Sequence, residues 1–198
     1  MAGIWSNLCS VKSNSIADAV FFLMSEWIET KGGTRISRLA IIDGASSITI
    51  SDACTVSAGC KLVGRESAAR GTKPVIALGK YVFLAANCTL DPSKSSGAAG
   101  DLGECTIGNY TTIGENSVVK LSFIGNRVRV GSNCHLGELC VINDCCIIED
   151  GAVVPKRSVI APFSRVRGVP GQDYVVEELS AAYRRVLELN SHLCKNLE

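Results

Sequence analysis

The residues that could do chemistry in this chain are two histidines and ten cysteines. A histidine can act as a general base in acyl transfer, and three histidines can hold a catalytic zinc ion, as in γ-class carbonic anhydrase. His135 and His192 cannot supply three ligands, and no carboxylate is obviously placed to orient His135. The chain also has no phosphate-binding loop, GxSxG, HExxH or dinucleotide motif. We therefore predict no catalytic residue, no metal ligand and no cofactor.

The cysteines do not have the spacing of a metal site or of a disulfide framework. No CxxC pair occurs, and the adjacent Cys145 and Cys146 are predicted to point to opposite faces of a strand. The apolar stretch from Ala19 to Met24 is too short to cross a bilayer, and nothing frames it as an export signal. We expect a soluble intracellular protein with free cysteines.

Composition favours one domain built from short, closely stacked strands. The chain has 198 residues, of which 46% are hydrophobic but only 6% aromatic, and it contains 19 glycines. Twenty basic residues balance 19 acidic ones, which leaves a net charge of +1. Because this balance creates no basic field, we expect no binding to nucleic acid and no membrane insertion.

A six-residue period must position these side chains. Aliphatic residues recur at eight consecutive positions, Ile124, Val130, Leu136, Ile142, Ile148, Val154, Ile160 and Val166. The register continues at Ile107, Ile113 and Val119, at Leu78, Leu84 and Leu90, at Ile50, Val56 and Leu62, and more weakly at Ile36, Ile42 and Ile48. This period predicts an all-β solenoid, a left-handed parallel β-helix of hexapeptide repeats, with a C-terminal α-helix after it.

Two other positions of the repeat support this fold. A small or β-branched residue stands two positions before each aliphatic one and is expected to face inward, and this slot holds Cys54, Cys60, Cys88, Cys105, Cys134, Cys140 and Cys146. A free cysteine there acts as a compact hydrophobe. A glycine often follows the aliphatic residue, where we expect a tight corner to need it.

The pattern divides the chain into three parts. Residues 1–35 form an N-terminal segment in which Ile16 to Ile28 could be a short helix, and residues 36–168 form the β-helix. Excursions at 63–74 and 91–104 interrupt it, as exposed loops or as partner contacts. Residues 173–198 are predicted to form an amphipathic helix with one apolar face made of Leu179, Tyr183, Val186, Leu193 and Leu197. That helix could cover the β-helix or present a partner surface.

Several segments resemble the dynactin subunit 5 family. They run from Ile124 to Cys134, through Asn143-Asp144-Cys145-Cys146, to Pro162-Phe163 and Gly168 to Gly171, and include Ser25 to Thr30 with Ile36 to Arg38. The match fades over residues 1–24 and 63–104. The hexapeptide period alone is shared with unrelated enzymes, whereas the Asn-Asp-Cys-Cys and Trp-Ile-Glu-Thr stretches are more specific.

The resemblance implies a non-enzymatic structural or adaptor subunit at the pointed end of dynactin, in the cytoplasm and cytoskeleton. It implies a hetero-oligomer with a second β-helix subunit, an actin-related protein and the cargo adaptors of dynein. It supplies no catalytic or binding residues. Two alternatives remain, a hexapeptide-repeat acyltransferase or carbonic-anhydrase-like homotrimer, and the sister β-helix subunit of dynactin.

Overall fold

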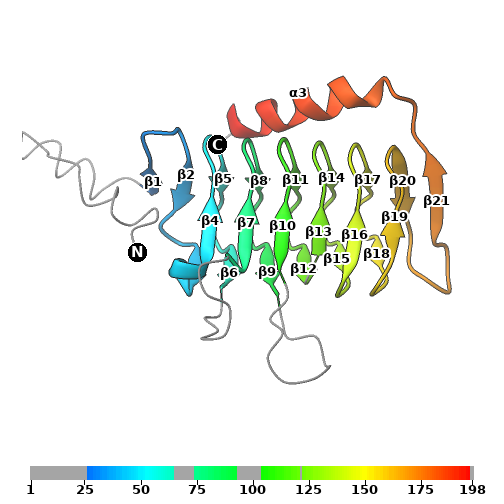
Figure 1. The fold of residues 1–198 in the computed structure, drawn as a ribbon, viewed down its shortest axis with the longest axis horizontal. Coiled ribbons are helices and arrows are strands. Elements are labelled where there is room, and N and C mark those ends of the chain that lie inside the picture. The colour runs from blue at the N-terminus through cyan, green and yellow to red at the C-terminus, as the bar shows by residue number, and fades with distance from the viewer. Residues whose placement is uncertain (1–25, 65–73, 93–103, 121, 197–198) are drawn as a thin grey trace, which may run out of the picture.

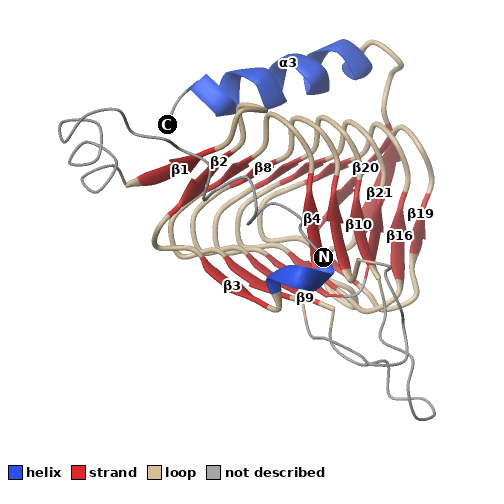
Figure 2. Cartoon of the chain, turned by 60° about the vertical axis from the view of Figure 1, so that its left-hand side comes forward, coloured by secondary structure: helices blue, strands red, loops and turns tan. Residues whose placement is uncertain are grey.

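The computed structural model describes residues 26–64, 74–92, 104–120 and 122–196. The chain winds as a triangular prism whose three sides are β-sheets, and one long helix lies along the outside (Figure 1). Figure 2 shows the prism obliquely, with the end of the first coils toward the viewer. The structure is the predicted left-handed parallel β-helix with a C-terminal helix.

Each coil contributes one short strand to each sheet. The first sheet contains β1 (Trp27–Glu29), β2 (Arg35–Ser37), β5 (Thr55–Val56), β8 (Phe83–Leu84), β11 (Thr112–Ile113), β14 (Arg129–Val130), β17 (Ile147–Ile148), β20 (Ser164–Arg167) and β21 (Val175–Glu178). The second contains β3 (Ile41–Asp43), β6 (Lys61–Val63), β9 (Thr89–Asp91), β12 (Val118–Lys120), β15 (His135–Leu136) and β18 (Val153–Val154). The third contains β4 (Ile48–Ile50), β7 (Ile76–Leu78), β10 (Cys105–Ile107), β13 (Ser122–Ile124), β16 (Cys140–Ile142) and β19 (Val159–Ile160).

The aliphatic positions form the ladders of the core, as the period predicted. Val130 pairs with Ile148, and Ile148 pairs with Val166, so residues one coil apart lie directly above one another. From Val56 onward the predicted ladder positions are buried. Ile42 and Ile50 in the first coil are only half-buried, because they lie at the end of the stack.

The glycines that follow the ladder residues serve the stacking, not the turn. None of them has a positive φ, which corrects the expectation of a tight corner. A Cβ on Gly114 would lie 2.5 Å from the backbone of Gly131 in the next coil, and one on Gly108 would lie 2.6 Å from the backbone of Gly125. These positions exclude side chains because adjacent coils approach too closely there.

The ends of the β-helix differ from the prediction. β1 and β21 are added antiparallel to β2 and β20, so the first sheet begins before residue 36 and continues beyond residue 168. Residues 27–29 are therefore a strand, not the end of a helix, while the rest of the proposed Ile16–Ile28 helix lies outside the described residues. Neither added strand carries the period, because each pairs only at the edge of a sheet and contributes no ladder residue.

The two excursions are anchored at the same corner of the prism. One joins β6 to β7 and the other joins β9 to β10, and both connections run from the second sheet to the third. The 3₁₀ turn at Ala45–Ser47 occupies that corner one coil earlier. Val63 and Asp91, which we had assigned to the excursions, are the last residues of β6 and β9. Residues 65–73 and 93–103 lie outside the described part.

The C-terminal helix α3 spans Tyr183–Asn196, a shorter range than the predicted 173–198. Before it, β21 occupies part of that range because Val175 to Glu178 pair along β20. A tight connection with left-handed glycines at Gly168 and Gly171 reverses the chain between these strands. α3 then runs back along the outside of the coils and contacts β8 and β11 (Figure 1).

The ladder register can be tested with one charge. Ile142→Asp places a carboxylate in a fully buried position of the core, so we expect a loss of about 3 to 5 kcal/mol of unfolding free energy. Val159→Asp is the control, because Val159 is 70% exposed on the outside of the third sheet. We expect less than about 1 kcal/mol there. Denaturant unfolding followed by circular dichroism measures both; equal losses would contradict the register.

Candidate functional site

Left-handed backbone recurs at the corners of the prism every six residues. From Arg127 to Phe163, each sixth residue has a positive φ, namely Arg127, Asn133, Leu139, Cys145, Gly151, Arg157 and Phe163. A residue with a Cβ pays about 1–2 kcal/mol in this conformation, except that asparagine and glycine adopt it more readily. The corner amides offset part of this cost by donating to the coil before, as the Arg127 N–H does to the Asn109 carbonyl at 2.8 Å.

The residue types at these left-handed positions differ between corners. The corner between the first and second sheets uses residues that tolerate the conformation, Gly59, Asn87, Asn116, Asn133 and Gly151. The corner between the third and first sheets uses mostly large ones, Ala53, Tyr81, Tyr110, Arg127, Cys145 and Phe163. We call Tyr81, Tyr110, Arg127, Cys145 and Phe163 the helix-facing corner. Leu139 and Arg157 adopt the same backbone at the corner between the second and third sheets, but only the corner between the third and first sheets has large residues in five successive coils, which points to a site there.

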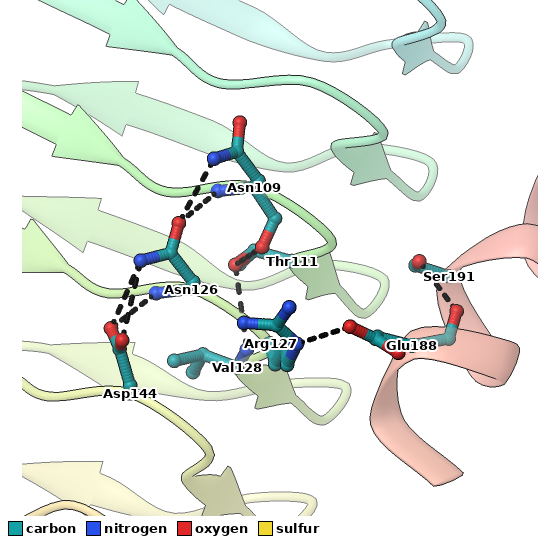
Figure 3. Close-up of polar contacts among 8 residues, drawn as sticks. All are labelled: Asn109, Thr111, Asn126, Arg127, Val128, Asp144, Glu188 and Ser191. Atoms are coloured by element: carbon teal, nitrogen blue, oxygen red, sulfur yellow. Dashed lines mark hydrogen bonds and ion pairs between the residues drawn. The ribbon is translucent and has the colours of Figure 1, made fainter. Parts of the chain in front are cut away.

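Residues of the helix-facing corner in successive coils each contact α3. Tyr81 and Tyr110 are stacked with ring centroids 4.9 Å apart, and the His192 ring meets them edge-on at 4.7 and 5.5 Å. One coil further on, the Arg127 guanidinium forms an ion pair with Glu188, shown in Figure 3. That guanidinium also lies 5.6 Å from the Tyr110 ring centroid.

The remaining contact of α3 is apolar. Leu187 packs in a small cluster outside the main core with Cys145, and Tyr183 and Phe163 lie against the same cluster. The helix-facing corner and α3 fit together because their spacings are similar. Successive coils are about 4.8 Å apart, and a helix rises about 5.4 Å per turn. Side chains four residues apart on α3 therefore meet successive coils, which fixes the rotation of the helix.

Beside the helix-facing corner runs a polar ladder (Figure 3). The Asn109 backbone and side-chain amides donate to Asn126 Oδ1 at 2.9 and 3.1 Å. The Asn126 backbone and side-chain amides donate in turn to Asp144 Oδ1 at 2.7 and 3.2 Å. The ladder immediately precedes Tyr110, Arg127 and Cys145, so it fixes the corners that present these side chains to α3.

The rotation of α3 corrects the predicted apolar face. Leu187 and Ser191 are buried, whereas Val186 and Leu193 of the predicted apolar face are exposed. Leu179 is buried but precedes the helix, and Leu197 lies outside the described residues. The sequence pattern failed here because docking is decided by the Arg127–Glu188 and tyrosine–His192 contacts, which a hydrophobic pattern does not show.

The seven slot cysteines are buried inside the coils, as predicted, but several do more than fill space. Their thiols donate to the next coil's corner carbonyl: Cys54 to Gly79 at 2.9 Å, Cys60 to Ala85 at 3.0 Å and Cys134 to Glu149 at 3.0 Å. Thr111 and Ser117 fill the same slot and donate to the carbonyls of Gly125 and Gly131. The slot therefore accepts small side chains and, in several coils, uses a donor that bonds the next coil, although Val82, Val128 and Ala152 also occupy it.

This environment makes the thiols poor nucleophiles and poor metal ligands. Burial raises the pKa of Cys146 to about 11 and raises that of Cys134. The Cys60 hydrogen bond and burial raise the pKa of Cys88. Because the thiolate is the reactive form, these groups remain protonated at neutral pH. Cys145 and Cys146 belong to separate clusters on either side of the chain, as predicted, although both lie at a turn and not within a strand.

The two histidines lie on different faces. His135 is half-buried on the outer side of the second sheet, between Val118 and Val153 of the neighbouring strands. Those hydrocarbon neighbours can neither orient an imidazole nor share a metal with it. His192 packs on the tyrosines of α3's docking site. Within the part of the chain that the structure describes, no three His, Cys, Asp or Glu side chains are grouped to hold a metal ion.

Known structures share the fold at low sequence identity. A putative acetyltransferase from Bacillus cereus is 19% identical, with a TM-score of 0.57 over 84% of this chain and 90% of that one. The Bacillus cereus N-acyltransferase AntD, with dTDP and 3-hydroxybutyryl-CoA, is 14% identical, with a TM-score of 0.60 over 92% and 97%. No curated protein matches the sequence. At these identities the structures establish the fold alone.

A family model separates this chain from other hexapeptide-repeat proteins. The model described as dynactin subunit 5 matches residues 16–188. The chain belongs to the dynactin subunit 5 family. The stretches that carried the resemblance have structural roles. Asp144 accepts the last hydrogen bonds of the polar ladder, Cys145 packs in the cluster with Leu187 of α3, and the Cys146 thiol donates to the Ala161 carbonyl. No helix among the described residues is long and apolar enough to cross a membrane.

The Trp-Ile-Glu-Thr stretch of the dynactin subunit 5 family likewise has a place in the fold. Trp27 and Glu29 lie on β1, and both contact Arg35 of β2. The Arg35 guanidinium lies 4.7 Å from the Trp27 ring centroid and 3.3 Å from Glu29 Oε1. This motif therefore holds the antiparallel strand that begins the first sheet.

The docking of α3 predicts an unusual effect of Tyr110→Asn. Asparagine relieves the left-handed strain, but the substitution removes the stack with Tyr81 and His192, contacts of about 0.5–1.5 kcal/mol each. Hydrogen exchange of the α3 amides should then accelerate roughly tenfold while exchange in the coils stays unchanged. Asn116→Gly, at the next corner of the same coil, is the control and should alter neither. Unchanged exchange in α3 would contradict this docking.

His135 gives a separate prediction about chemistry. His135→Ala should leave the unfolding free energy within about 1 kcal/mol of the parent, because the side chain faces outward on the sheet. Purified protein should contain no stoichiometric zinc by metal analysis. One tightly bound zinc ion per chain, lost in this variant, would instead favour an enzyme.

Proposed function

We propose that this chain is a non-enzymatic structural subunit of the dynactin pointed-end complex, in which the β-helix supplies shape and not chemistry. Membership of the dynactin subunit 5 family carries the proposal. The site geometry supports it, since His135 and His192 lie on separate faces and the slot thiols are buried hydrogen-bond donors. The subunit would work in the cytoplasm, associated with the cytoskeleton.

The proposed immediate partner is a second β-helix subunit that stacks on the first coil. At the last coil, β21 continues the first sheet and Tyr174 packs against the core. At both ends no strand among the described residues pairs with the outer edges of the second and third sheets, which are β18 and β19 in the last coil and β3 and β4 in the first, where β1 continues the first sheet. Leu39 and Ile41 are 70% and 57% exposed there. A stacked partner would satisfy the edge backbone groups and cover these side chains.

The proposal also includes a wider assembly. An actin-related protein at the pointed end and the cargo adaptors of dynein are the other expected partners, and attachment of dynein and dynactin to cargo is the expected task. We propose the residues from 36 to 168 as the scaffold of this assembly. The excursions at 63–74 and 91–104 leave and re-enter the coils at the same corner of the prism, and we propose that corner for a partner contact.

Affinity purification of the tagged full chain from cells tests this assignment. Mass spectrometry should recover a second hexapeptide-repeat protein together with actin-related subunits of dynactin. Leu39→Asp combined with Ile41→Asp should lose the second hexapeptide-repeat protein, because charge would stand where the partner's coil stacks. Val159→Asp, equally exposed on the third sheet, should retain it and controls for added charge.

The competing enzymatic hypothesis gives a different result in the same experiment. A hexapeptide-repeat acyltransferase or carbonic-anhydrase-like protein would be recovered as a homotrimer without actin-related proteins. A homotrimer that binds acyl-CoA would overturn the proposal. Recovery of the full complex with the Leu39 and Ile41 variant would overturn the stacking end alone and leave membership of dynactin in place.

A further inference from the structure

The solvent side of α3 carries an apolar ridge, defined here as Val186, Leu189 and Leu193. These side chains are 55%, 54% and 61% exposed. Of the four aliphatic residues in α3, only Leu187 is buried. A helix on a protein surface ordinarily turns its aliphatic stripe toward the core of its own chain. In α3, by contrast, most of the aliphatic side chains point away from the core.

The ridge cannot be hidden by rotation of α3 without breaking its docking. Glu188 is paired with Arg127, and His192 is held on Tyr81 and Tyr110. Leu187 is fixed in the cluster with Cys145. Because these contacts occupy the side of α3 that faces the coils, they commit Val186, Leu189 and Leu193 to the opposite side.

The spacing of the ridge is that of a helix-packing seam. Val186, Leu189 and Leu193 are three and four residues apart, the a, d and a positions of a heptad. Such a row extends about 10 Å, or two turns, and fits the groove of a second helix. A flat sheet or an extended peptide would leave this narrow ridge largely uncovered.

The charges around the ridge favour an acidic partner. Arg184 and Arg185 are exposed in the first turn of α3, and that turn contains no acidic residue. The helix dipole favours acids there and disfavours these arginines. Glu188, the acidic residue of α3, is turned toward Arg127 on the side of the coils. Arg184 lies on the coil side, three residues before the buried Leu187, and its charge acts on Cys145. Arg185, four residues before Leu189, is therefore the positive charge beside the apolar ridge.

We propose that the ridge of α3 binds an amphipathic α-helix of a partner protein, one with an apolar a/d seam and acidic residues in the flanking positions. The apolar seam supplies the contact, and the partner's carboxylates offset the charge of Arg185 at the start of α3. A second copy of this chain fits less well, because it would bring a second Arg185 to the interface. This inference does not depend on membership of dynactin.

The test uses the purified full chain and two designed helical probes. Both are fluorescent 21-residue peptides with leucine at every a and d position, and they carry glutamate or lysine at every e and g position. Fluorescence anisotropy should show that the glutamate peptide binds at least tenfold more tightly than the lysine peptide. Equal binding of the two peptides, or no binding of the glutamate peptide, overturns the proposal.

Variants locate the binding site. Leu189→Ser with Leu193→Ser should weaken binding of the glutamate peptide at least tenfold, whereas Val159→Ser, another exposed aliphatic position, should leave it unchanged. Unchanged binding by the double variant, or loss with Val159→Ser, overturns the proposal. Circular dichroism confirms that each variant is folded.

A charge reversal gives a readout that does not depend on removing the ridge. Arg185→Glu should reduce the preference for the glutamate peptide over the lysine peptide at least tenfold, and an unchanged preference overturns the acidic partner. Sedimentation of the chain without peptide tests the remaining possibility, that a second copy of the chain occupies the ridge. Dimerisation that the Leu189 and Leu193 double variant abolishes would show that a second copy binds the ridge, and would overturn the proposal.

Discussion

The fold depends on one constraint: every coil must stack on the next at the spacing of hydrogen-bonded strands, about 4.8 Å. This spacing leaves no room for a Cβ at Gly108 or Gly114, because the backbone of the next coil lies there. It also places equivalent residues of successive coils in columns, so a side chain suited to one coil must suit its neighbours. Ladders of aliphatic residues, donors in the slot and left-handed corner residues are all consequences of this stacking.

Features that repeat with the coils could be predicted from the sequence. Ile142 and Ile148 are buried where the six-residue period placed them, and Cys134 lies in the inward slot. The hydrogen bond from Cys134 to the Glu149 carbonyl was not foreseen, although Ser117 in the same column and Thr111 in the equivalent slot of the first sheet carried the signal. A slot that holds Cys, Ser and Thr in several coils indicates a donor facing a carbonyl.

Features set by contacts outside the repeat could not be predicted in this way. β1 and β21 pair only at the edges of one sheet, so neither adds a residue to a ladder. The orientation of α3 depends on Arg127 and on the tyrosines, which lie far from it in sequence. The hydrophobic pattern grouped Val186 and Leu193 on one apolar face but could not show whether that face packs on the coils, because a polar and aromatic column, not the core, docks the helix.

The free-energy cost of left-handed backbone at the helix-facing corner is evidence that the position of α3 matters. Asn116 and Asn133 show that tolerant residues can occupy left-handed corners of this chain, although Leu139 and Arg157 adopt the same backbone at the corner between the second and third sheets. Tyr110 and Arg127 adopt the same backbone at greater cost, and both contact α3. Stability of the coils alone would favour asparagine or glycine there. The strained residues hold the helix in one rotation, and that rotation exposes Leu189 and Leu193 to whatever binds outside.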